Sequence, residues 1–144
     1  MLKNLDPLLS PDLLHALRLM GHGDEIAVVD ANFPAASVAK RLIRLDGVSA
    51  IAVVDAILSV MPLDDFATDA AWRMEVAGEA QAEQPIFGGF RDLLALREGA
   101  RVRLATLERF AFYERAGEAF AVVATGERRL YGNPLLKKGV VRPN

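Results

Sequence analysis

The sequence predicts a three-layer α/β sandwich, in which helices cover both faces of a largely parallel or mixed sheet. Two observations predict this class: short apolar, β-branched runs alternate with segments of helical spacing, and several runs are continuous enough for strands buried on both faces. The 144 residues, 52% of them hydrophobic, suffice for one packed core, and no internal repeat or interdomain linker divides them. We therefore expect one domain spanning residues 1–144.

The first helix and the first strand are marked by the residues at their ends. Ser10 is a favourable N-cap, Pro11 suits the first helical position, and Gly21 follows the helical segment, so a helix is predicted after Ser10. Residues 26–29 form an apolar run that ends abruptly at Asp30, which predicts a buried strand. The carboxyl end of such a strand is a common place for a ligand-binding group.

The next part of the chain predicts a loop, a buried helix and a strand. Residues 32–34 mark a loop, whereas residues 38–47 fit either a short helix or an alternating strand. Residues 48–61 are apolar almost all round, which predicts a buried helix that ends before Pro62. Residues 72–77 alternate between apolar and polar side chains and predict a strand.

The second half of the chain continues the alternation of helices and strands. The apolar residues Phe87, Phe90 and Leu94 recur at helical spacing. The predicted elements are a helix over residues 85–98 closed by Gly99, a strand over 102–106, a short helix over 108–116, a buried strand over 119–125, and a loop with a brief extended segment over 131–141.

Composition excludes several classes of partner and chemistry. The 17 basic and 19 acidic residues give a net charge of -2 and are scattered, so we expect no nucleic-acid or anionic-membrane surface. Cysteine is absent, which excludes disulfides, thiolate metal sites and a cysteine nucleophile. The N-terminal segment holds prolines and acidic residues where a signal peptide needs an apolar core, and no apolar run is long enough for a membrane span. We expect a cytoplasmic protein with a neutral small ligand and no metal or other cofactor.

Two histidines and two aspartates come early in the chain. His15 lies within the first predicted helix, where a structural role is expected, whereas His22 lies between two glycines after the helix ends. Histidine exchanges protons near neutral pH, so His22 is a candidate acid or base, although an ordinary turn histidine would fit the same pattern. Asp24 could orient an imidazole or cap the approach to the strand. Asp30 follows four apolar residues, where a buried charge without a partner would be costly, and this favours a binding role.

Two further segments offer binding groups. Residues 109–115 place aromatic side chains between charges, and Arg109 and Tyr113 could form a sugar platform, although such aromatics more often belong to the core. Residues 126–133 suit a polar binding loop and lack the glycine and lysine spacing of a phosphate-binding loop. No serine elbow or metal-spaced histidine cluster is present, which argues against hydrolases and metalloenzymes.

Four blocks of the sequence together resemble the D-ribose pyranase and L-fucose mutarotase family, also called RbsD/FucU. The blocks are GHGDEI at 21–26, Asp30 with FPA at 33–35, RFAFYERA at 109–116 and TGERRLYGNPLLKKGV at 125–140. The Gly-His-Gly-Asp and Tyr-Gly-Asn forms are closer to the fucose branch than to ribose pyranases, which show Gly-His-Thr-Asp and Tyr-Ala-Asn. Pro134 departs from the family pattern, in which an aliphatic residue is commoner.

The resemblance implies an isomerase that interconverts the anomers of a free monosaccharide, with L-fucose as the expected substrate. It implies that His22 is the proton donor and that Asp30, Arg109 and residues 131–133 (Tyr131, Gly132 and Asn133) bind the sugar. It also implies a homo-oligomer, a decamer of two stacked pentameric rings, with sites near subunit contacts. The residues agree with this chemistry, because anomer exchange needs an acid and base near neutral pH and requires neither a redox step nor a metal. Asp24 and Tyr113 are supporting candidates.

Three other functions stay open at this point. D-ribose pyranose to furanose exchange shares the ring-opening step, and a monosaccharide-binding protein without catalysis would use the same polar residues. A structural oligomer without a ligand would leave Asp30 and Arg109 without partners.

Overall fold

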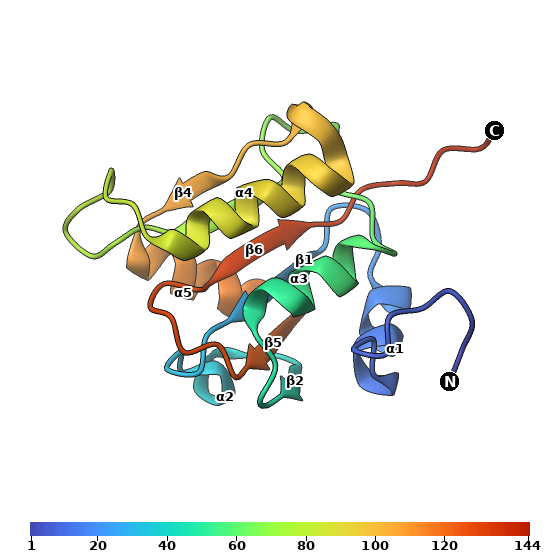
Figure 1. The fold of residues 1–144 in the computed structure, drawn as a ribbon, viewed down its shortest axis with the longest axis horizontal. Helices are drawn as coiled ribbons and strands as arrows, with labels where there is room; N and C mark the ends of the chain where they lie inside the picture. The colour runs from blue at the N-terminus through green and yellow to red at the C-terminus, as the bar shows by residue number, and fades with distance from the viewer.

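The computed structural model describes residues 1–144 and contains one six-stranded sheet (Figure 1). The strand order is β2-β5-β1-β6-β3-β4. Strand β6 runs antiparallel to both of its neighbours, β1 and β3, while the other neighbouring strands are parallel. The prediction of a largely parallel or mixed sheet is therefore confirmed, and the sheet is mixed. The strands are β1 (Glu25–Val29), β2 (Leu42–Leu45), β3 (Ala71–Met74), β4 (Ala105–Leu107), β5 (Ala121–Thr125) and β6 (Pro134–Lys137).

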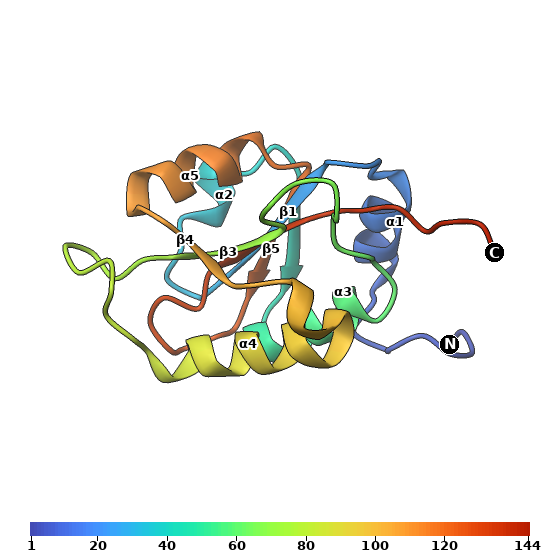
Figure 2. The ribbon, with the colours of Figure 1, turned by 90° about the horizontal axis from the view of Figure 1, so that it is seen from above.

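Helices cover both faces of the sheet, and each face has its own hydrophobic core. Figure 2 shows α3 and α4 on one face and α2 and α5 on the other. The larger core joins α1, α3 and α4 to the sheet, and the smaller core joins α2 and α5 to it. The helices are α1 (Pro11–Leu19), α2 (Ala35–Val38), α3 (Ala50–Leu58), α4 (Pro85–Glu98) and α5 (Arg109–Glu118), with a short 3-10 helix at Gly99–Arg101. No helix has the length and apolar character that a membrane span needs.

Local capping signals set the ends of the helices. The Ser10 side chain accepts a hydrogen bond from the Leu13 N–H, which confirms the predicted start of α1. Ser49 caps α3 in the same way, so this helix starts two residues later than its apolar run. Helix α4 spans the predicted residues and ends at Gly99, whose φ of 70° suits glycine.

Sheet pairing settles the strands that sequence periodicity leaves open. Residues 42–45 form β2, a strand and not a helix, because all four of them pair in parallel with residues 122–125 of β5. Strand β4 begins at Ala105, three residues later than predicted, since only residues 105–107 reach the register of β3. All four residues of β3 are buried, so the predicted alternation does not describe a one-sided strand there.

The extended segment predicted near the C-terminus is β6, which lies inside the sheet between β1 and β3. Pro134 is its first residue and lies opposite Arg73. Proline lacks the N–H that a ladder needs and is accepted at the first position of a strand, so this departure from the family pattern fits the sheet. The position of β6 places the polar residues just before it at the carboxyl ends of β1 and β3.

Candidate functional site

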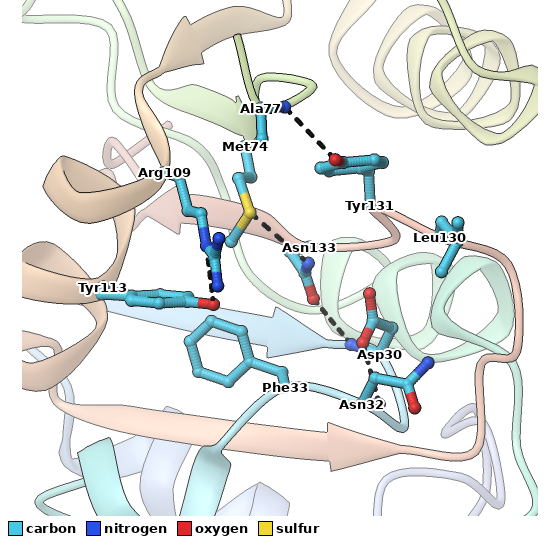
Figure 3. A pocket seen from close by; sticks show the side chains of 10 residues that line it. All are labelled: Asp30, Asn32, Phe33, Met74, Ala77, Arg109, Tyr113, Leu130, Tyr131 and Asn133. Atoms are coloured by element: carbon cyan, nitrogen blue, oxygen red, sulfur yellow. Dashed lines mark hydrogen bonds between the residues drawn. The ribbon is translucent and has the colours of Figure 1, made fainter.

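A cavity of about 300 Å³ opens at the end of the sheet where strands β1 and β3 finish and β6 begins. This position matches the place where open α/β sheets bind ligands. Figure 3 shows its polar side chains converging from segments far apart in the sequence. The cavity is lined by Asp30, Asn32, Phe33, Met74, Ala77, Arg109, Tyr113, Leu130, Tyr131 and Asn133.

Asp30 and Asn133 form the buried polar floor of the cavity. The Asn133 side-chain oxygen accepts the backbone N–H of Asp30 at 2.8 Å, and the Asn133 amide nitrogen lies 4.0 Å from the Met74 sulfur. One oxygen of the Asp30 carboxylate accepts the Asn32 N–H at 2.9 Å. The remaining carboxylate oxygen and the Asn133 amide leave acceptor and donor capacity for hydroxyl groups.

Burial raises the pKa of the Asp30 carboxyl group, and hydrogen bonds from Asn32, Asn133 and nearby backbone groups offset only part of this effect. Only 5% of Asp30 is exposed. Burial therefore makes the ionised form of this carboxyl group energetically unfavourable, and groups with perturbed pKa values of this kind are common in functional sites.

Tyr131 and Gly132 hold an unusual backbone conformation next to the floor. Tyr131 has a φ of 62°, a left-handed conformation that costs a non-glycine residue roughly 1–2 kcal/mol. Its hydroxyl accepts the Ala77 N–H at 3.2 Å and ties the 75–84 loop to the cavity wall. A Cβ atom on Gly132 would lie 2.9 Å from the Glu127 side chain, so close packing requires glycine here.

Glu127 anchors the 126–133 loop that carries these residues. Its buried carboxylate accepts hydrogen bonds from the Ala50 N–H, the Arg129 N–H and the Arg129 guanidinium at 2.9–3.2 Å. The bonds from Arg129 and Ala50 outweigh burial and lower the pKa of Glu127 to about 2. The Glu127 carbonyl also accepts the Ala31 N–H at 2.9 Å, which joins this loop to the segment after Asp30.

Arg109 and Tyr113 form the opposite wall and come from the first turns of α5. The Arg109 Nε–H donates to the Tyr113 hydroxyl at 3.2 Å, and this bond raises the pKa of Arg109. The Tyr113 ring meets Phe33 edge to face, with centroids 5.2 Å apart. Glu108 caps α5 by accepting the Phe110 and Ala111 N–H groups, which fixes where Arg109 starts the helix.

Five lining residues were not among the predicted site residues. Asn32 and Phe33 directly follow Asp30, so their place after the strand was the available signal. Met74 ends β3 and Leu130 precedes Tyr131, whereas Ala77 contributes through its backbone and carries no side-chain signal. The predicted residues Asp30, Arg109, Tyr113, Tyr131 and Asn133 all line the cavity, and Gly132 lies between two of them.

His22 and Asp24 lie at the opposite end of the strands from the cavity. Both precede β1, and this strand spans roughly 15 Å before it delivers Asp30 to the cavity. The Gly23 N–H bonds to the Lys138 carbonyl just after β6, whereas Asn133 lies before β6. Asp24 accepts the Gly21 N–H at 2.8 Å and closes the turn around His22. Within one chain, therefore, the imidazole does not reach the cavity.

The His22 ring is not sealed in the interior. Its Nε2 lies 2.8 Å from a carboxylate oxygen of Asp64, and the side chains of these residues are 43% and 4% exposed. The Phe66 ring packs against the imidazole at a centroid distance of 4.8 Å. No local pattern of residues identifies Asp64 as the partner of His22, because the two are 42 residues apart along the chain.

The cavity can bind a small, neutral, hydroxyl-rich molecule. Asp30 offers an acceptor, Asn133 and Arg109 offer donors, and Phe33, Tyr113 and Met74 offer apolar contact for the carbon face of a sugar ring. No three His, Asp or Glu side chains come together as a set of metal ligands.

Comparisons of sequence and of structure with known proteins find relatives in the same family. The sequence model of the RbsD / FucU transport protein family matches residues 3–141. The fucose mutarotase of Homo sapiens is 46% identical over 149 aligned residues, which cover 99% of this chain and 96% of that protein. The crystal structure of a Streptococcus pneumoniae fucose mutarotase in complex with L-fucose superposes with a TM-score of 0.91 at 44% identity, covering 98% of this chain and 100% of that one. Bacillus subtilis RbsD complexed with D-ribose shares the fold, with a TM-score of 0.73 at 21% identity over 99% of this chain and all of that one.

Proposed function

The chain belongs to the RbsD / FucU family, and from this premise we propose that it is a fucose mutarotase, an isomerase that interconverts the α and β anomers of L-fucose. The observation that carries the proposal is the full-length similarity to fucose mutarotases at 44–46% identity. A fucose-bound relative has the same fold. The relative complexed with D-ribose is much more distant, at 21% identity, and this disfavours D-ribose pyranase as the main activity.

The site residues divide into a binding set and a proton-transfer group. Asp30, Arg109, Tyr131 and Asn133 bind the ring hydroxyls, with Gly132 allowing the close turn and Tyr113 packing against the sugar. The support is that the side chains of these binding residues line one cavity at the carboxyl ends of β1 and β3. His22 is the proton-transfer group, and Asp24 supports it by closing its turn.

Ring opening is a balanced proton exchange. The anomeric hydroxyl gives up its proton, the ring oxygen receives one, and the bond between the anomeric carbon and the ring oxygen breaks to give the open-chain aldehyde. Rotation about the adjacent carbon–carbon bond then presents the other aldehyde face to the same hydroxyl, which recloses the ring. A positioned acid and base contribute about 10²–10⁴-fold to such steps.

His22 reaches the sugar from a second copy of the chain in this proposal. Two observations support it: β1 separates His22 from the cavity of its own chain, and the imidazole is half-exposed at a surface that carries the exposed Phe66. A closed ring of copies would place each His22 at the cavity of a neighbour, as in a decamer of two stacked pentamers. We also infer a cytoplasmic location, since the proposed substrate is a free monosaccharide.

Exchange NMR on free sugars tests the activity. Saturation transfer between the anomers of L-fucose should increase with protein concentration, and D-ribose should exchange more slowly. Acceleration of ribose alone would replace the substrate. Sugar binding without acceleration would instead favour a non-catalytic binding protein, and the absence of any binding would favour a structural oligomer.

Two kinds of variant test the role of His22. His22→Gln should abolish exchange, whereas His15→Gln is the matched control because His15 is exposed on α1. Co-assembly of inactive His22→Gln chains with strongly impaired Asp30→Asn chains should restore wild-type activity in about a quarter of the sites, since the two defects then fall on different copies. No recovery in mixed assemblies would exclude a site shared between copies.

A further inference from the structure

We infer that Phe66 is a sugar-contacting residue, which reaches the cavity of a neighbouring copy together with His22 and packs against the C–H face of the bound sugar. This inference rests on the proposed function, because it adds an apolar contact to the same shared site. Phe66 does not line the cavity of its own chain.

Phe66 is an exposed aromatic residue whose ring is held in a fixed direction. Its centroid lies 4.8 Å from that of His22, and the two ring planes are tilted by 51°. The Arg142 guanidinium lies over the ring at 5.3 Å and pairs with Asp65. The Phe66 N–H donates to the Asp64 carboxylate at 3.2 Å, which fixes the backbone. Despite these contacts Phe66 is 67% exposed, so most of its apolar surface is left for another molecule.

The contact with His22 brings this apolar surface to the sugar. Proton transfer requires the imidazole to lie within about 2.6–3.2 Å of a sugar oxygen. An aromatic ring packed directly against the imidazole then lies beside the carbons near that oxygen. Wherever the surface of one copy delivers His22, it therefore delivers Phe66 as well.

The chemistry of the expected sugar suits an aromatic contact. The 4-hydroxyl of L-fucose is axial, so the C–H bonds at carbons 3, 4 and 5 gather on one face of the ring. Aromatic side chains offer a large, rigid apolar surface to such a face. The polar cavity residues Asp30, Arg109 and Asn133 serve the hydroxyl groups, and Phe66 adds an apolar surface that they do not supply.

Kinetics of Phe66→Ala provide the first test. We expect KM for L-fucose to rise about 3- to 10-fold, the usual size of an aromatic contact, with kcat within about two-fold of the wild-type value. D-arabinose should show the same rise, because it has the same hydroxyl configuration and lacks only the C6 methyl group. Phe66→Leu, which keeps apolar volume, should recover part of the affinity. Leu96→Ala is the matched control, since Leu96 is 72% exposed on α4, and it should change neither constant.

Mixed assemblies show which copy contributes Phe66. Phe66→Ala chains mixed with Asp30→Asn chains should give wild-type KM in about a quarter of the sites, where an intact His22 and Phe66 meet an intact Asp30. Phe66→Ala chains mixed with His22→Gln chains should give no such sites, because both defects lie on the same contributed surface. Sites of wild-type KM in this second mixture would overturn the inference.

Fluorescence reports the contact directly. Trp72 is the one tryptophan of the chain, so Phe66→Trp in a Trp72→Phe background carries a single reporter at position 66. Titration with L-fucose should move its emission to shorter wavelength and saturate. An emission that does not respond to saturating L-fucose refutes the contact.

The outcomes separate this inference from the proposed function. If the wild-type protein does not accelerate L-fucose exchange, the proposed function is wrong and the role of Phe66 falls with it. If the wild-type protein is active and His22→Gln is inactive while Phe66→Ala keeps the wild-type KM for both sugars, only the role of Phe66 is refuted. A Phe66→Ala protein that elutes as a smaller assembly and regains wild-type KM at high protein concentration also refutes it, because Phe66 is then a contact between copies.

Discussion

Replacing Glu127 by glutamine tests whether one buried carboxylate holds the sugar-binding loop in place. The substitution keeps the shape of the side chain but replaces one acceptor oxygen by an amide NH2 group, a hydrogen-bond donor that would face the Ala50 or Arg129 donors. It also removes the ion pair with Arg129, whose Nε lies 2.9 Å from the carboxylate. The residues that follow in this loop include Tyr131 and Asn133, so loosening it should also weaken sugar binding.

The size of the effect follows from the pKa of Glu127, which falls from 4.5 to about 2 on folding. Each pKa unit corresponds to about 1.4 kcal/mol, so the ionised carboxylate contributes about 3 kcal/mol to the free energy of unfolding. Because the folded-state pKa is depressed, this contribution is fully present above pH 4.5 and is lost as the pH falls towards 2. Glu127→Gln should therefore be less stable by about 2–3 kcal/mol at neutral pH.

The assay is urea unfolding of the wild-type protein and the variant at equal protein concentration over a series of pH values. The difference in unfolding free energy should be constant above pH 4.5 and should shrink by about 1.4 kcal/mol per pH unit below it. Other carboxylates titrate in both proteins, so their contributions cancel in this difference. Equal concentrations are needed because association of copies adds to the apparent stability.

A stability difference that does not change between pH 5 and pH 3 would refute the reasoning, because it would show that the charge of Glu127 is not what stabilises the loop. Glu118→Gln is the matched control. Glu118 is an exposed glutamate at the end of α5, and its side chain makes no hydrogen bond or ion pair within the chain. It should leave both the stability and its pH dependence unchanged.

Three further predictions concern the cavity. Asp30→Asn should lower kcat/KM for L-fucose by about 10- to 100-fold while leaving the protein at least as stable at neutral pH. The pKa of Asp30 is raised, so its contribution to stability is present at low pH and lost as the pH rises through the folded-state value, a loss that asparagine avoids. Gly132→Ala should cost about 1–3 kcal/mol in urea unfolding, because its Cβ would lie 2.9 Å from Glu127 and 3.0 Å from Ile86. Leu130→Ser should raise KM about four-fold for L-fucose but not for D-arabinose, because the Leu130 side chain offers apolar contact to the C6 methyl group, which D-arabinose lacks.

Each of these predictions has its own contradicting result. A large loss of stability in Asp30→Asn would show that the carboxylate is structural. Wild-type stability in Gly132→Ala would show that the loop relaxes around the added methyl group, and an equal KM change for both sugars in Leu130→Ser would place the C6 methyl group elsewhere. Gly88→Ala on α4 is the control for the glycine substitution, because no atom lies within 4 Å of its added Cβ.

Features fixed by nearby residues were predictable from the sequence. Helix α1 starts after Ser10 and α4 ends at Gly99, because each cap is a bond or conformation of adjacent residues. Asp30 was identifiable as the polar end of a buried strand. By contrast, β2 was ambiguous, because its four residues take their conformation from pairing with β5.

The candidate site shows the same division. The sequence identified Asp30, Arg109, Tyr131 and Asn133, the first from its place after an apolar run and the others through the family resemblance, and the fold brings all four to one cavity. It did not identify Met74 or the Ala77 N–H, because an apolar side chain and a backbone group carry no chemical signature. The role of Glu127 was also hidden, since its partner Ala50 lies 77 residues away.

The sequence by itself determined the fold class, the family, the start of α1, the end of α4 and the polar residues available for chemistry, because these depend on composition, on short-range spacing and on side-chain type. Only the tertiary structure decided where those residues lie. The central place of β6, the pairing of His22 with Asp64, and the separation of His22 from Asp30 by the length of β1 all follow from sheet order. Sheet order arises from contacts between distant segments, which no local pattern of residues encodes.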